Sequence, residues 1–247
     1  MNLILEILRE QKQMQLKGNL YHITQIIFAY NTNHIEGNSL TEEQTRYIYE
    51  TNTFVAEEGN HTANVDDIIE TSNHFKLVDY MLDIADEVLT EDRIKEFHKI
   101  LKTGTSDERK TWFNVGEYKE LANEIGGSKT SSPEEVAKDM QNLLDWYHHL
   151  EEVTFEDIVK FHSDFEKIHP FQDGNGRVGR MILFKECLKS NMVPLIILDK
   201  DKLFYYRGLK EYQNGGEKGY LLDTCLNAQD QYQKLVQQYC KQCRGDY

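Results

Sequence analysis

Residues 168–180, with the sequence IHPFQDGNGRVGR, bring together side chains that handle protons, metal ions and anions. The segment contains one imidazole (His169), one carboxylate (Asp173), two guanidinium groups (Arg177 and Arg180) and three glycines. An imidazole accepts a proton near neutral pH, and a carboxylate binds Mg²⁺ that shares its ligands with phosphate oxygens. These groups indicate nucleotide phosphate chemistry with His169 as the base.

The glycines in this segment predict a tight loop that leads into a helix. An Asp-Gly-Asn-Gly run disfavours helix and strand alike, because glycine costs about 1 kcal/mol relative to alanine in a helix. Apolar residues then recur at helical spacing over residues 177–188. The unpaired N–H groups and the dipole at such a helix N-terminus form an anion site. Arg177 and Arg180, three residues apart on one face, add cationic groups suited to phosphate.

The segment is not a GxxxxGK[ST] phosphate loop, which occurs nowhere in the sequence. It resembles the Fic family signature HPFx[D/E]GNGRxxR, in which every fixed position is filled here. The resemblance implies transfer of AMP from ATP to a hydroxyl side chain of a target protein. It implies that His169 deprotonates this hydroxyl and that Asp173 holds Mg²⁺. The nucleotide-binding residues that it implies are Asp173, Gly174, Asn175, Gly176, Arg177 and Arg180.

A second short pattern lies at residues 32–37, whose sequence TNHIEG fits the [S/T]xxxE[G/N] motif of autoinhibited Fic proteins. Thr32 and Glu36 are four residues apart and share a helix face. The resemblance implies that Glu36 pairs with Arg180 where the γ-phosphate of ATP would bind, so that ATP is held in an unproductive position. A solvated glutamate at a helix end is the alternative. In some Fic proteins this glutamate positions a water that removes AMP, so a hydrolytic direction also stays open.

Residues 103–132 lack a helical period and contain the pair Gly126-Gly127. Residues 117–125 are compatible with an extended arm before a glycine turn, which favours a β-hairpin, with a surface loop as the alternative. The resemblance implies that this hairpin is a flap on which the target protein presents its hydroxyl. It also implies that Asn123, Gly126 and Gly127 pass near the nucleotide.

The tyrosine pair at residues 205–206 lies in a segment with helical spacing. The resemblance implies that Tyr205 contacts the adenine of ATP, with Gln213 or Asn214 as a weaker candidate. The alternative is that Tyr205 belongs to the core, as most tyrosines in helical register do.

The elements that must position these groups are predicted to be mostly helices. Apolar spacing and capping residues predict helices over 1–17, 20–36, 65–84, 90–102, 133–150 and 154–168, with others starting after Thr41 and at 203. We therefore expect a mainly α fold, a Fic-type helical bundle with a small β-hairpin flap. Along the chain we expect an N-terminal helical region (1–60), a Fic core (61–215) and a C-terminal helical extension (216–247).

Composition restricts the partners and the location. The net charge of −14 argues against non-specific binding to nucleic acid. No apolar run approaches the roughly 20 residues that span a bilayer, and the N-terminus lacks the pattern of a signal peptide. We expect no nucleic-acid or membrane partner and a cytoplasmic location. The sequence leaves a homo-oligomer open.

Four cysteines invite a zinc or disulfide interpretation. Cys240 and Cys243 form a CxxC pair, but a zinc site would need a second close pair, and Cys187 and Cys225 stand alone. Reduced thiols are the preferred interpretation.

Two other classes of function compete with AMP transfer onto proteins. The same site could transfer UMP, phosphocholine or phosphate, or the chain could bind nucleotide as a sensor with little turnover. For AMP transfer we expect ATP and Mg²⁺ as the ligands.

Overall fold

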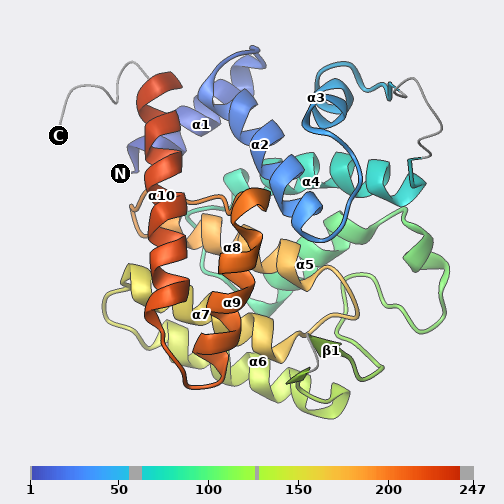
Figure 1. The fold of residues 1–247 in the computed structure, drawn as a ribbon, viewed down its shortest axis with the longest axis vertical. Helices are drawn as coiled ribbons and strands as arrows, with labels where there is room; N and C mark the ends of the chain where they lie inside the picture. The colour runs from blue at the N-terminus through green and yellow to red at the C-terminus, as the bar shows by residue number, and fades with distance from the viewer. Residues whose placement is uncertain (1, 56–62, 126–127, 240–247) are drawn as a thin grey trace.

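The computed structural model of the chain describes residues 2–55, 63–125 and 128–239 (Figure 1). Within these ranges the chain forms ten α-helices, two short 3₁₀ helices and one two-stranded sheet. The α-helices are α1 (Leu3–Met14), α2 (Leu20–Ile35), α3 (Glu42–Thr51), α4 (Val65–Asp83), α5 (Glu91–Lys102), α6 (Pro133–His148), α7 (Phe155–Ile168), α8 (Asn175–Lys189), α9 (Lys202–Gln213) and α10 (Gly219–Tyr239). The 3₁₀ helices are η1 (Ser106–Arg109) and η2 (Asp199–Asp201). The predicted mainly helical fold is confirmed. Among the described helices, none combines the length and the apolar character needed to cross a bilayer.

Capping residues fix several helix starts locally, as the sequence predicts. Thr41 Oγ1 accepts from the backbone N–H of Gln44 at 3.2 Å, and Gln44 Oε1 accepts from the N–H of Thr41 at 2.9 Å. Thr154 and Asp157 make the same reciprocal pair at the start of α7. Each pair satisfies N–H groups that the first turn of a helix leaves unpaired.

Helix α8, which carries the second half of the glycine-rich segment, lies in the middle of the molecule (Figure 1). It contacts α2, α4, α5 and α7, and all its residues except Gly176 and Lys189 are buried. A single apolar cluster extends from Leu5 in α1 to Val236 in α10. The regions expected at 1–60, 61–215 and 216–247 therefore share one core in the described part of the chain.

The hairpin consists of β1 (Glu124–Ile125) and β2 (Ser128–Lys129), which pair antiparallel. The strands are shorter than the extended arm expected over residues 117–125. This difference has a physical reason: the backbone N–H of Lys119 donates to the carbonyl of Pro170 at 2.9 Å, and that of Leu121 donates to Gln172 Oε1 at 3.2 Å. The base of the hairpin thus pairs with the glycine-rich loop instead of with a second strand. The glycine turn at 126–127 lies outside the described residues.

Candidate active site

His169 lies where α7 meets the tight loop. Its backbone has φ 53° and ψ 62°, and its N–H donates to the carbonyl of Phe165 at 2.9 Å, which closes α7. At the other end of the loop, Gly174 has φ +79° and caps α8. Helix α8 begins at Asn175, two residues before the start of its apolar period. The predicted glycine loop leading into a helix N-terminus is confirmed.

The side chain of Asn175 holds this loop closed. Its Oδ1 accepts from the N–H of Phe171 and its Nδ2 donates to the carbonyl of Phe171, both at 2.8 Å. Asn175 is 1% exposed, so its amide is committed to the loop. The backbone N–H of Asn175, in the first turn of α8, remains for an anion, so its contact with phosphate stays a prediction.

His98 of α5 supports the loop from the opposite side. Its ring stacks on Phe171 with centroids 4.0 Å apart and planes 2° from parallel. Its Nδ1 accepts from the N–H of Gly116 at 2.9 Å, so Nε2 carries the proton and donates to the carbonyl of Asp173 at 3.1 Å. Burial lowers the pKa of His98 to about 3, which agrees with a neutral ring.

The environment of His169 keeps its imidazole neutral. Burial and, second, the positive charge of Lys119 lower the pKa of His169 to about 4. The backbone of Glu166 and the carboxylates of Glu36 and Asp173 act in the opposite direction. Nδ1 is buried, so Nε2 is the nitrogen available to a substrate. At physiological pH His169 can therefore accept a proton.

Asp173 belongs to a network of ion pairs. Its Oδ2 accepts from Lys102 Nζ at 2.7 Å and from Arg177 Nη2 at 3.2 Å. Lys102 Nζ also binds Glu70 at 2.5 Å and Asp107 at 2.6 Å. Burial raises the pKa of Asp173, but Arg177 and Lys102 more than offset this effect and hold it well below its usual range. Asp173 is therefore ionised.

One oxygen of Asp173 suits a divalent cation. Carboxylate oxygens of Glu70, Asp107 and Asp173 lie within 4.8 Å of one another, but the buried ammonium of Lys102 already binds all three. Both cationic side chains bind Oδ2 of Asp173, whose side chain is 52% exposed. Its Oδ1 thus offers one ligand, which fits Mg²⁺ because this ion keeps several waters and takes other ligands from phosphates.

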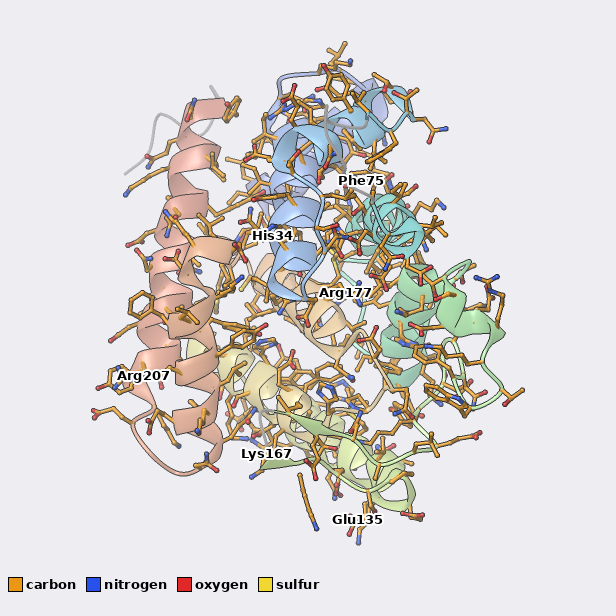
Figure 2. All side chains as sticks on the ribbon, turned by 45° about the vertical axis from the view of Figure 1, so that its right-hand side comes forward. His34, Phe75, Glu135, Lys167, Arg177 and Arg207 are labelled. Atoms are coloured by element: carbon orange, nitrogen blue, oxygen red, sulfur yellow. The ribbon has the colours of Figure 1, made fainter. Side chains whose placement is uncertain are left out.

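Arg177 binds two carboxylate groups. It lies near the centre of the molecule (Figure 2), is 3% exposed, and donates from Nη1 to Glu70 and from Nη2 to Asp173. Its terminal nitrogens are therefore engaged with carboxylates and not directed toward a phosphate. In this structure Arg177 acts on the site by holding Asp173, and a direct contact with phosphate stays a prediction.

Arg180 instead pairs with the segment at the end of α2. Its Nε donates to Thr32 Oγ1 at 2.7 Å, and its Nη2 donates to the carbonyl of Thr32 at 3.0 Å and to Glu36 Oε1 at 2.6 Å. Burial opposes the charge on Arg180, yet Glu36 helps to raise its pKa above the ordinary value. The geometry expected for Thr32, Glu36 and Arg180 is present.

Glu36 also covers the N-terminus of α8. A Cβ added to Gly176 would lie 2.2 Å from Glu36 Oε1 and 2.9 Å from Arg180 Nη1. Only a residue without a side chain allows the carboxylate to come this close. An internal anion thus occupies the place where the unpaired N–H groups and the dipole of α8 favour negative charge.

Asn123 lies against the loop, as expected, but its amide is in use. Its Nδ2 donates to the carbonyl of Phe171 at 3.1 Å, and its Oδ1 accepts from Lys119 Nζ and from Thr130 Oγ1. It therefore joins the hairpin to the loop. The other two flap residues expected near the nucleotide, Gly126 and Gly127, lie outside the described residues.

The structure places Tyr205 in the core and not at an open surface of the site. It is 1% exposed, its hydroxyl pairs with His162 Nε2 at 2.7 Å, and its ring lies 5.8 Å from the guanidinium of Arg180. The expected adenine contact is corrected in favour of the core interpretation. Tyr206 is the more exposed member of the pair, and its hydroxyl donates to the carbonyl of Ile35 at 2.9 Å.

The weaker adenine candidates lie at the end of α9. Gln213 Nε2 donates to the carbonyl of Ser163 at 3.0 Å, and Asn214 is the residue that ends the helix. In the described part of the chain, neither forms a hydrogen bond or an ion pair with the glycine-rich loop.

Cys187 and Cys225 are buried free cysteines, and burial raises the pKa of both thiols. Cys240 and Cys243 lie outside the described residues.

Sequence reasoning missed three charged residues at the site: Glu70, Lys102 and Lys119. They come from α4, α5 and the base of the hairpin, far apart along the chain. No local spacing links them to residues 168–180. The signal that could have found them is charge inside otherwise apolar helical stretches, as at Glu70 and Lys102.

Comparison with known proteins agrees with the geometry. The sequence model described as "Fic/DOC family" matches residues 88–186. The chain is 27% identical over 189 residues to "Protein adenylyltransferase Fic" of Nematostella vectensis, covering 75% of this chain and 43% of that protein. It is 23% identical over 216 residues to "Protein adenylyltransferase fic-1" of Caenorhabditis elegans, covering 86% of this chain and 41% of that protein. The chain thus spans about two fifths of the length of these curated relatives.

Solved structures share the fold. A Fic domain containing signaling protein from Bacteroides thetaiotaomicron superimposes with a TM-score of 0.74 at 22% identity, covering 98% of each chain. Fic-1 from C. elegans superimposes with a TM-score of 0.73 at 21% identity, covering 94% of this chain and 69% of that one. The expected helical architecture is therefore shared with solved proteins.

Proposed function

Because the chain contains a Fic/DOC family domain, we propose that it is a protein adenylyltransferase, which moves AMP from ATP to a serine, threonine or tyrosine hydroxyl of a target protein. One observation carries the proposal. His169, a neutral imidazole, begins a loop that ends at the anion-binding N-terminus of α8, where Arg180 already holds a carboxylate. A proton acceptor beside a triphosphate site is what this reaction requires.

In the proposed reaction, the hydroxyl oxygen of the target attacks the α-phosphorus of ATP while His169 takes the hydroxyl proton. The new O–P bond forms as the bond between the α-phosphorus and the oxygen bridging to the β-phosphate breaks, and pyrophosphate leaves with the electron pair. Backbone N–H groups at residues 174–176 and the guanidinium of Arg180 stabilise the negative charge of the phosphates. His169 then releases its proton to solvent.

We propose that Asp173 holds Mg²⁺ through its other carboxylate oxygen, Oδ1, which neither Lys102 nor Arg177 binds. The ion, when bound, would supply positive charge to the phosphates. Lys102 and Arg177 keep Asp173 ionised and fix the position of its other oxygen. These two side chains thus keep Asp173 in the form that a metal requires.

Thr32 and Glu36 form the proposed autoinhibitory segment. Glu36 binds Arg180 and lies against Gly176, the one accessible residue at the N-terminus of α8. A γ-phosphate would need the same guanidinium and the same cradle. Two anions cannot share them without strong repulsion, so ATP must displace Glu36 or bind in another position.

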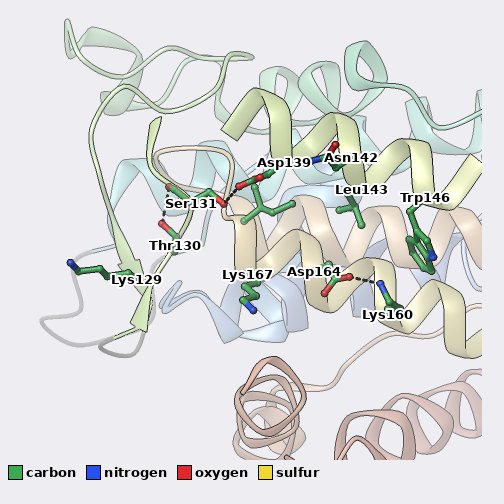
Figure 3. A pocket seen from close by; sticks show the side chains of 11 residues that line it. Lys129, Thr130, Ser131, Asp139, Asn142, Leu143, Trp146, Lys160, Asp164 and Lys167 are labelled. Atoms are coloured by element: carbon green, nitrogen blue, oxygen red, sulfur yellow. Dashed lines mark hydrogen bonds and ion pairs between the residues drawn. The ribbon is translucent and has the colours of Figure 1, made fainter. Parts of the chain in front are cut away.

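A groove beside the hairpin is the proposed contact for the target protein. It has a volume of about 510 Å³ and runs from Lys129 and Thr130 in and beside β2 to Trp146 in α6 and Lys167 in α7 (Figure 3). Ile168, which precedes His169, also lines it. A segment of the target protein bound at the hairpin would therefore lie close to His169. Backbone pairing with the hairpin would hold the target's hydroxyl there with little preference for sequence.

Two alternatives remain distinct. Glu36 lies close enough to the cradle to orient a water, which would favour removal of AMP from a modified protein. Transfer of another group would use the same cradle with a different part of the nucleotide at the base.

ATP labelled on either the α- or the γ-phosphate separates these functions. With Mg²⁺ and a mixture of candidate target proteins, AMP transfer leaves the α label and not the γ label on protein. Phosphate transfer gives the reverse, and bound ATP without covalent label supports a sensor. Loss of AMP from a previously labelled protein, without new labelling, would support the hydrolytic direction.

A further inference from the structure

Lys119, at the base of the hairpin, is a buried cation that the proposed reaction does not use. It is 4% exposed, and burial lowers its pKa to about 8. Among the described residues no carboxylate forms an ion pair with it. Buried ammonium groups are costly unless paired, so a lysine in this position needs a reason.

The contacts of Lys119 surround His169 on both sides in the sequence. Its Nζ donates to the carbonyl of Ile168 at 3.4 Å, and its backbone N–H donates to the carbonyl of Pro170 at 2.9 Å. Lys119 thus holds the backbone carbonyls of the two residues that flank the base. His169 itself has a positive φ of 53°, a conformation that its surroundings must hold in place.

The same ammonium also binds both arms of the hairpin. It donates to Asn123 Oδ1, before β1, and to Thr130 Oγ1, after β2, both at 2.7 Å. Asn123 in turn donates to the carbonyl of Phe171. The hairpin and the loop that carries His169 are therefore joined through one side chain.

The charge of Lys119 acts on the base as well. After burial, it is the second largest cause of the lowered pKa of His169, against the opposing effects of Glu36, Asp173 and the backbone of Glu166. A fixed cation next to an imidazole disfavours its protonated form.

We propose that Lys119 is the positioning residue that joins the hairpin to the backbone on both sides of His169 and places a fixed positive charge beside this base. The role of Lys119 in catalysis rests on the proposed function. Its effect on the protonation of His169 can be measured without any activity.

The first test is an NMR titration of His169 in the full chain, with the signal identified by its absence in His169→Asn. In Lys119→Met and Lys119→Gln, which lack the charge, we expect the proton affinity of His169 to rise about tenfold. Lys119→Arg should leave it near the parent value. Lys138→Met removes an exposed cation on α6 and should have no effect. An unchanged titration of His169 in both neutral variants would overturn the inference. If one neutral variant does not fold, the other is still compared with Lys119→Arg.

The second test measures AMP transfer as a function of pH in a Glu36→Gly background. In Lys119→Met, the pH below which the rate of AMP transfer falls should be higher, and the maximal rate should be lower. Lys119→Arg should restore both toward the parent values. If no variant transfers AMP while the NMR shift occurs, the proposed function fails and the positioning role of Lys119 stands. If AMP transfer proceeds equally in all variants, the positioning role fails and the proposed function stands.

Discussion

Glu36, at the end of α2, accepts a hydrogen bond of 2.6 Å from Nη2 of Arg180 in α8. The same carboxylate oxygen would lie 2.2 Å from a Cβ at Gly176. The side chain of Glu36 thus both binds Arg180 and covers the N-terminus of α8. In a phosphate-transfer site, the arginine and the helix N-terminus would both bind the phosphates of the substrate. The contact of Glu36 with both therefore connects the fold to the regulation of the site.

Replacing Glu36 by glycine should activate the protein. The change frees Arg180 and opens the cradle, and coupling of this kind is typically worth 5- to 150-fold, so we expect AMP transfer to rise about tenfold or more. The rate can be measured as label from α-labelled ATP on protein. Glu43→Gly, at an exposed position in α3, is the matched control and should leave the rate unchanged. Equal rates for parent and Glu36→Gly, with ATP bound in both, would count against autoinhibition.

A methyl group at Gly176 should weaken ATP binding. In the Glu36→Gly background, Gly176→Ala fills the cradle that the phosphates need, and we expect an affinity loss of about tenfold, measured by calorimetry with Mg²⁺ and ATP. Gly219→Ala, where an added Cβ meets nothing within 4 Å, should bind as the parent does. Equal affinities for the two alanine variants would show that phosphates do not approach Gly176.

The local chemistry of the site could be predicted because it lies in one continuous segment. The loop and the helix start follow from residue types at fixed spacing, whereas the pairing of Glu36 with Arg180 is implied by the resemblance to the Fic family. The roles of Asn175 and Arg177 could not, because side chains that bind phosphate and side chains that hold a loop have the same chemistry. Only the partners, Phe171 for Asn175 and Glu70 for Arg177, distinguish the two uses.

Removing the ammonium of Lys102 should destabilise the fold. Lys102→Met removes the one ammonium that binds all three carboxylates and leaves Arg177 as the partner of Glu70 and Asp173 only; loss of such a buried pair costs about 3 kcal/mol. Urea unfolding measures this loss. Millimolar Mg²⁺ should restore part of the stability, since the cluster then offers ligands to a metal. Lys99→Met, at a position 60% exposed, serves as the control. Stability equal to that of the parent would contradict the role given to Lys102.

His74 should make the protein sensitive to acid. It is fully buried beside Arg177 and Arg180, both ring nitrogens lack a hydrogen-bond partner among the described residues, and burial lowers its pKa from 6.5 to about 3. The unfolded chain binds a proton here that the folded chain excludes, so stability falls as pH drops below about 6.5. This contribution amounts to about 2 kcal/mol at pH 5.

The variant His74→Leu removes the side chain that binds this proton in the unfolded chain. We expect the difference in unfolding free energy between pH 8 and pH 5 to shrink by about 2 kcal/mol relative to the parent, whatever the variant's stability at pH 8. His149→Leu, at an exposed position, should leave the difference unchanged. An undiminished pH dependence in His74→Leu would mean that His74 accepts its proton without unfolding.

Long-range contacts set the limit of prediction for the fold. Helices could be predicted because their caps and apolar spacing are local, as at Thr41 and Thr154. The hairpin is shorter than expected because Lys119 and Leu121 pair with the loop at residues 170–172, 51 residues away along the chain. Tyr205 lies in the core, where its hydroxyl forms a hydrogen bond with Nε2 of His162 in α7, a contact that no spacing around Tyr205 reveals.

The most direct test of the central claim compares Glu36→Gly with Glu36→Gly/His169→Ala. Both proteins are incubated with Mg²⁺ and ATP and examined by intact mass spectrometry, alone and with candidate targets, after calorimetry has shown that both bind ATP. The account predicts a mass gain of one AMP on protein with the first variant and a loss of at least 100-fold in rate with the second. Equal AMP labelling by the two variants would contradict the assignment of His169 as the base.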